Sequence, residues 1–156
     1  MDDQQLQERV QEFIRRFGLL DQERTPCGRP MPTSHAHALQ ILGRGGGMTQ
    51  RELAARLRLD ESTVSRLVDR QVRSGWVERA TDERNRRRSR LALTPAGHAV
   101  LDEVRRASAA KFRLIQDRIP PAQRGHILAA FDVLIAAIGE EPRAHAHPTD
   151  ADPHQA

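Results

Sequence analysis

Apolar residues recur at helical spacing in the first part of the chain. The first set repeats at three- and four-residue intervals and comprises Leu6, Val10, Phe13, Ile14 and Phe17. This spacing predicts a helix, and Gly18 directly after it is the expected C-terminal stop. Three prolines and a glycine between residues 19 and 32 predict a loop. Ser34 is then the expected N-cap of a second helix, which ends in the glycine-rich linker 43–47.

Two short helices follow the linker, and each has a clear start signal. Thr49 and Glu52 have the spacing of a capping box, so a third helix is expected to begin there. Asp60 is the expected N-cap of a fourth helix, and Gly75 is its expected stop. The turn between the two helices has about three or four residues, which is typical of a helix-turn-helix.

The pattern changes to alternation after Gly75 and predicts a β-hairpin. Residues 76–79 and 88–93 are the two expected strands. In the second strand, Leu91 and Leu93 share one side, and Arg88, Arg90 and Ala92 share the other. The hairpin and its loop carry five arginines within seven positions, namely Arg84, Arg86, Arg87, Arg88 and Arg90.

Two further helices complete the pattern. Thr94 and Pro95 form an N-cap and first-turn pair that predicts a long helix, and a last helix is expected to follow Pro120-Pro121 and to stop at Gly139. Residues 140–156 contain no large apolar side chain and are expected to be disordered. The predicted fold is mainly α with a small β-hairpin (α+β) and six helices. Its expected parts are residues 1–32, 33–93, 94–139 and 140–156.

Composition narrows the class of protein without deciding its function. The chain has 156 residues, about one domain by length, with 38% apolar and 29% charged residues. No uninterrupted apolar run approaches the ~18 residues of a membrane span, and the acidic start is unlike a signal peptide. We therefore expect a cytoplasmic protein with no membrane partner. A single cysteine, Cys27, excludes an internal disulfide framework.

Positive charge is concentrated in one part of the chain. The formal net charge is only +4, but residues 66–90 contain nine arginines and four acidic residues, a local net charge of +5. Such a segment is expected where a protein meets an anionic polymer. All but one of the 25 basic residues are arginines, the exception being Lys111, so the position of an arginine is more informative than its identity.

The fourth helix has two distinct faces at 100° per residue. One face is an apolar stripe that includes Val64, Leu67, Val68 and Val72, interrupted by Gln71. The polar side carries hydroxyls and arginines, which reach phosphates and base edges. The candidate DNA-binding residues of this helix are Ser62, Thr63, Ser65, Arg66, Asp69, Arg70 and Arg73.

The capped helix pair and the basic hairpin together carry a family resemblance. Residues 33–105 resemble the winged helix-turn-helix core of the MarR family of bacterial transcription regulators. The resemblance implies that the fourth helix enters the major groove and that the hairpin is a wing whose tip arginine enters the minor groove. Arg87 is at the position of that arginine, and Asn85 replaces the acid that usually accompanies it. Arg84 or Arg86 therefore also qualifies, and Arg88 and Arg90 are expected to contact phosphates.

The resemblance also implies a homodimer formed through the N- and C-terminal helices. The number of large apolar residues in these helices supports this, because a thin monomer does not bury them all. Two-fold symmetry then predicts a pseudo-palindromic double-stranded operator. The expected function is repression that is released when a small-molecule effector binds.

Three residues bear on the kind of effector, namely Cys27, His35 and His37. A redox role for Cys27 and a metal-responsive role for all three are alternatives to a small-molecule pocket. On a helix, however, His35 and His37 point about 200° apart, which disfavours one shared ion. We therefore assign no metal site and no cofactor, and a pocket for a small molecule, which His37 lines, is the default.

The sequence disfavours two other classes of function. A winged-helix protein-interaction module has little use for a segment of net charge +5. An enzyme is not expected, because the sequence shows no nucleophile triad, carboxylate pair or phosphate-binding loop.

Overall fold

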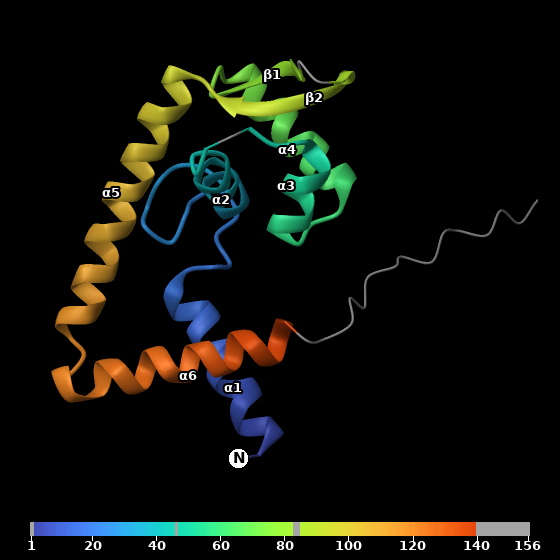
Figure 1. The fold of residues 1–156 in the computed structure, drawn as a ribbon. Coiled ribbons are helices and arrows are strands. Elements are labelled where there is room, and N and C mark those ends of the chain that lie inside the picture. The colour runs from blue at the N-terminus through green and yellow to red at the C-terminus, as the bar shows by residue number, and fades with distance from the viewer. Residues whose placement is uncertain (1, 46, 83–84, 140–156) are drawn as a thin grey trace, which may run out of the picture. The chain divides into compact units, whose positions relative to one another are not determined.

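The computed structural model describes residues 2–45, 47–82 and 85–139, with the side chains of 81–88 outside this description (Figure 1). The chain divides into two compact units, Met1–Arg113 and Leu114–Ala156. The described part contains six helices and one hairpin, as the sequence predicts. In chain order these are α1 (Asp3–Phe17), α2 (Thr33–Leu42), α3 (Gln50–Leu57), α4 (Glu61–Arg73), β1 (Val77–Asp82), β2 (Asn85–Leu93), α5 (Pro95–Asp117) and α6 (Pro121–Gly139).

Local capping explains most of the helix ends. Gly18 closes α1 with a φ of 86°, a left-handed conformation that glycine adopts without strain. Thr49 and Glu52 form the predicted capping box of α3. Asp60 accepts from the Thr63 amide at the start of α4, at 2.7 Å. Thr94 accepts from the Gly97 amide at 3.0 Å and so caps α5.

One predicted cap is wrong. Helix α2 begins at Thr33 with Pro32 as N-cap, so Ser34 lies inside the first turn, and no side chain caps the helix. The Pro32 carbonyl instead accepts from the His35 and Ala36 amides, at 3.0 and 3.3 Å. Proline at this place has the extended backbone that a cap position needs, which makes a serine cap unnecessary.

The core of the first unit lies where α2, α3, α4, the hairpin and α5 meet. Its fully buried side chains include Leu39, Leu53, Val64, Leu91 and Leu101. Gly97 sets the approach of α5, because a Cβ there would lie 1.9 Å from the Trp76 carbonyl oxygen. This close packing fixes the start of α5 against the end of the helix-turn-helix.

The hairpin is longer than the apolar alternation predicts. Val77 pairs with Leu93 and Thr81 with Ser89, and the register shifts between Thr81 and Asp82. The first strand therefore runs three residues beyond Arg79, and the second begins at Asn85 rather than Arg88. Backbone pairing thus extends the strands beyond the residues where the alternation of apolar side chains gives a signal.

Helix α6 of the second unit is apolar on all sides, and none of its residues is buried. Its most apolar window has a mean hydropathy of 1.2, and the helix has 19 residues, enough by length and composition to cross a membrane. This criterion differs from the search for an apolar run of ~18 residues, because Arg124, His126 and Asp132 interrupt the apolar run of α6.

Candidate nucleic-acid interface

Helix α4 presents its predicted polar side to solvent. Ser62, Arg66, Arg70 and Arg73 are exposed, and Thr63, Ser65 and Asp69 are half-buried. The opposite side is packed in the core through Val64, Leu67, Val68 and Gln71. We call the seven exposed and half-buried residues the polar face of α4. This division follows from helical periodicity alone, as the sequence predicts.

Hydroxyl groups at the start of the polar face are held by the helix cap. Ser62 and Thr63 donate to the Asp60 carboxylate at 2.6 and 2.7 Å. These hydrogen bonds, the one from Ser62 first, hold the pKa of Asp60 well below its usual range. Because their protons are directed to Asp60, both hydroxyls present lone pairs outward and act as acceptors in this conformation.

Two of the three arginines on the polar face have guanidinium groups that contact no partner among the described residues. Arg70 and Arg73 form no hydrogen bond or ion pair with any other residue that the structure describes. Arg66 makes only a long contact of 3.4 Å with the Thr63 hydroxyl. All three line a groove that the start of α2 borders. Unpaired arginines on a surface helix are available for an external anion.

Asp69 differs from its neighbours because it is already paired. Arg79 of β1 donates to the Asp69 carboxylate at 2.8 Å and reaches the Gln50 side chain at 3.5 Å. Sequence reasoning missed Arg79. The alternation in β1 could have identified this residue. Val77 is buried, and Arg79, two positions later, lies on the same face of the strand.

The predicted arginines of the hairpin fall into two groups. Arg90 is half-buried and donates to the Gly47 carbonyl at 2.7 Å, so it anchors the linker between α2 and α3 to the hairpin. Arg84 lies outside the described residues. Arg86, Arg87 and Arg88 belong to β2 by their backbone, and their side chains lie outside the description. That one of the arginines at the wing tip enters the minor groove stays a prediction.

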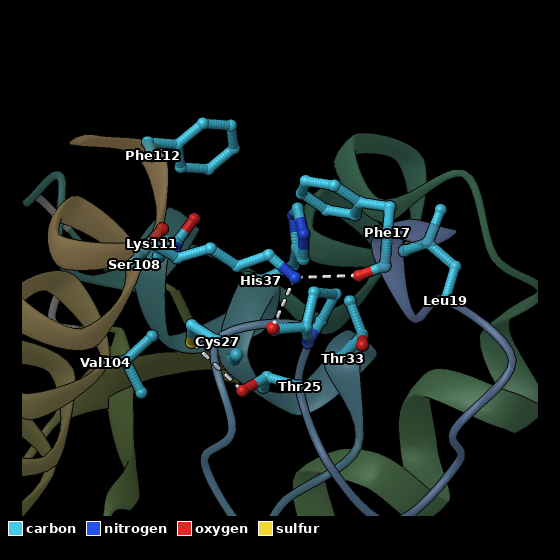
Figure 2. Close-up of a pocket in the computed structure, with 13 residues that line it drawn as sticks. Phe17, Leu19, Thr25, Cys27, Thr33, His37, Val104, Ser108, Lys111 and Phe112 are labelled. Atoms are coloured by element: carbon cyan, nitrogen blue, oxygen red, sulfur yellow. Dashed lines mark hydrogen bonds between the residues drawn. The ribbon is translucent and has the colours of Figure 1, made fainter. Parts of the chain in front are cut away.

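A separate pocket of about 240 Å³ lies in the first unit, lined by residues of α1, α2, α5 and the loop before α2 (Figure 2). Cys27 and His37 both line it, and Cys27 lies 3.1 Å from the Thr25 hydroxyl. Lys111 spans the pocket wall: its ammonium group donates to the Phe17 and Pro26 carbonyls at 2.8 and 2.6 Å. It also lies 4.4 Å from the centroid of the Phe17 ring.

His35 lies away from this pocket, on the side of α2 that borders the arginine groove. It is only 7% exposed, and burial, followed by the charge of Arg70, lowers its pKa. The expected divergence of His35 and His37 is thus confirmed. No group of three His, Cys, Asp or Glu side chains among the described residues is arranged to hold a metal ion.

Comparison with known proteins agrees with this geometry. A family model described as the MarR family matches residues 30–88. BilQ of Clostridium symbiosum, an HTH-type transcriptional regulator, is 36% identical over 62 residues, 40% of this chain and 43% of the relative. A putative transcriptional regulatory protein for the hcr operon of Thauera aromatica is 27% identical over 104 residues, 67% of this chain and 63% of the relative.

Residues 30–88 of this chain thus resemble the MarR family, from the loop before α2 to the middle of β2. The chain spans less than two thirds of the length of these curated relatives. In its winged-helix fold, α3 and α4 form the helix-turn-helix and β1–β2 form the wing.

Solved structures show the same fold over most of this chain. FabT of Streptococcus pneumoniae, solved in complex with DNA, has a TM-score of 0.74 at 18% identity and covers 88% of this chain and 98% of its own. PcaV of Streptomyces coelicolor, solved with its natural ligand, has a TM-score of 0.66 at 23% identity and covers 89% and 92%. The predicted fold class is confirmed.

Proposed function

We propose that the protein is a cytoplasmic, dimeric transcription regulator that binds double-stranded DNA through α4 and the wing. The observation that carries this is the set of unpaired guanidinium groups on the polar face of α4. Arg70 and Arg73 are exposed and have no partner among the described residues. They lie on a helix narrow enough for the major groove, beside a hairpin that contributes to a local charge of +5.

Each part of this interface has its own task. Arginine reads guanine through two parallel hydrogen bonds or holds phosphates, and the hydroxyls of Ser62 and Thr63 accept from base amino groups. The Asp69–Arg79 pair ties the wing to α4, so that both reach the duplex in one register. The wing arginines among residues 84–88 contact the minor groove and the DNA backbone. The negative potential of the groove and the charge of the phosphates attract them there.

A second copy of the chain is the proposed partner of α6. Leu128, Val133 and Ile135 of this helix are 67%, 71% and 64% exposed in a single chain. A helix that is apolar on all sides is stable in water only when other helices cover it. Phe13 of α1 and Phe112 of α5 are also exposed, at 44% and 53%. We assign these surfaces to a two-fold dimer, which requires a pseudo-palindromic operator with half-sites about one helical turn apart.

The pocket of Figure 2 is the proposed effector site. It is lined mostly by apolar atoms and contains a few polar groups, the usual character of a small-molecule site. Lys111 offers a positive charge there, which suits an effector with an anionic or aromatic group. Occupation of the pocket is proposed to shift the recognition helices and release a repressed promoter.

Selection of bound duplexes from a random pool tests the DNA-binding proposal. The expected result is enrichment of a pseudo-palindromic sequence by a particle whose mass, from light scattering, is that of two chains. Arg73→Ala is expected to weaken binding to the selected duplex, and Arg106→Ala, an exposed arginine of α5, serves as the matched control. A wild-type protein that enriches no sequence and binds no duplex at low salt overturns the proposal.

A further inference from the structure

We propose that Gln71 is a positioning residue that couples the wall of the pocket to the recognition helix α4. The inference rests on the proposed function, because it concerns how occupation of the pocket changes DNA binding. It assigns a role to a polar side chain that interrupts the apolar stripe of α4 and that DNA contact does not explain, since Gln71 faces away from solvent.

Gln71 is completely buried, with 0% of its surface exposed. Its side-chain nitrogen donates to the His35 carbonyl of α2 at 3.0 Å. Its side-chain oxygen is buried and has no hydrogen-bond partner in the described part of the chain. A buried oxygen without a partner destabilises the folded state, so an apolar side chain of similar size suits packing better. Packing therefore does not explain a glutamine at this position. What Gln71 provides, and an apolar side chain does not, is a directional hydrogen bond from α4 to α2.

Helix α2 stands between this bond and the pocket. Thr33, Ala36, His37 and Gln40 of α2 line the pocket, and Thr33 and His37 are labelled in Figure 2. The His35 carbonyl of the same helix accepts the hydrogen bond from Gln71. A displacement of α2 by a pocket ligand therefore acts on a backbone group that α4 holds directly. Cores are close-packed, so a helix moves as a body and carries its bonded neighbour with it.

The same stretch of α4 is tied on its other side to the wing. Asp69, two residues before Gln71, pairs with Arg79 of β1. Helix α4 is thus bonded to the pocket wall through Gln71 and to the wing through Asp69, with the free Arg70 between them. Filling the pocket is expected to move α4 and the wing together, relative to the DNA half-site that the partner chain binds.

The only cysteine supplies a probe that needs no knowledge of the effector. Cys27 lines the pocket, so benzyl methanethiosulfonate places a benzyl group there. The Cys27 thiolate attacks the sulfenyl sulfur, a disulfide forms, and methanesulfinate leaves. Mass spectrometry checks for one label per chain, and Cys27→Ser treated in the same way is the control.

Dissociation constants for the selected duplex are compared before and after labelling. In the wild type, the label is expected to weaken binding about 10-fold, a typical strength for coupling between two sites. In Gln71→Met, which keeps the length and loses the amide, the change is expected to be below about 3-fold, which is less than the usual range of such coupling. Unlabelled Gln71→Met is expected to bind DNA and to unfold at the wild-type temperature or above it.

Two results overturn the inference. One is an equal change of affinity on labelling in wild type and Gln71→Met. The other is a wild-type affinity that the label does not alter. If the wild type binds no DNA, the proposed function fails, and hydrogen exchange of the α4 amides still decides the inference. The label must then change exchange in α4 of the wild type and not of Gln71→Met.

Discussion

Arg79 of β1 donates a hydrogen bond to the Asp69 carboxylate of α4 at 2.8 Å, and this pair joins the wing to α4. The Asp69 carboxylate is therefore already paired in this structure and is not a free acceptor. Because Arg79 also reaches Gln50 of α3, a single side chain connects α3, α4 and β1.

Removing this pair is expected to change DNA binding more than stability. The two side chains are 42% and 43% exposed, and such pairs stabilise a fold by only ~0.2–1 kcal/mol. Asp69→Asn and Arg79→Met are expected to weaken DNA binding by similar factors, and the double variant by no more than either one. Affinity measurements with the selected duplex, beside chemical unfolding, check this. A base preference that changes in Asp69→Asn and not in Arg79→Met contradicts this prediction. It means that Asp69 contacts a base directly.

Arg73 is expected to contribute one phosphate contact per chain. The logarithm of the binding constant falls linearly with the logarithm of salt concentration, with a slope of about −0.9 for each neutralised phosphate. Arg73→Ala is expected to make the slope of the dimer less steep by about 2, one contact from each chain. Titrations at several salt concentrations measure it. An unchanged slope together with altered base preference means that Arg73 reads a base instead.

The Asp60 cap is expected to make stability depend on acid pH. Its folded-state pKa is depressed by the bonds from Ser62 and Thr63, so its contribution is complete above the ordinary aspartate value and is lost as pH falls below it. Asp60→Asn keeps a capping oxygen but does not titrate. Melting temperatures from pH 7 downward are expected to fall less steeply in Asp60→Asn than in the wild type. Parallel pH curves for the two proteins contradict this assignment.

His35 is expected to titrate below the ordinary pKa of a histidine. Burial is the larger cause and the charge of Arg70 the second, so Arg70→Met is expected to raise the pKa of His35 only part of the way to its ordinary value. Because the folded state favours neutral His35, stability is full above the ordinary histidine pKa and declines as pH falls below it. NMR titration, with the signal assigned by His35→Gln, measures the shift. If the pKa of His35 is the same in Arg70→Met as in the wild type, Arg70 does not lie close to the imidazole in solution.

Charge on α6 is expected to separate the proposed dimer. Val133 is 71% exposed in a single chain, and Val133→Asp places an unpaired carboxylate in the assigned interface. Light scattering is expected to show one chain per particle, and Gln123→Glu at the polar start of α6 is expected to remain dimeric. If the Val133→Asp protein has the mass of two chains, the dimer interface does not include this face of α6.

Local chemistry explains what the sequence predicts well. The capping box of Thr49 and Glu52, the Asp60 cap and the Gly18 stop each involve residues within a few positions of one another. Helical periodicity likewise predicts which side of α4 is buried and that His35 and His37 diverge, because side-chain direction repeats with the helix. The error at Ser34 is also local, since Pro32 competes for the cap position.

The sequence by itself thus determined the helices, the hairpin and the polar face of α4, because these depend on neighbours along the chain. Only the tertiary structure decided the partners of individual polar groups. Arg79 pairs with Asp69, Arg90 with the Gly47 carbonyl, Gln71 with the His35 carbonyl and Lys111 with the Phe17 and Pro26 carbonyls. Each of these bonds joins different elements, and its formation depends on how those elements pack, which no spacing along the chain reveals.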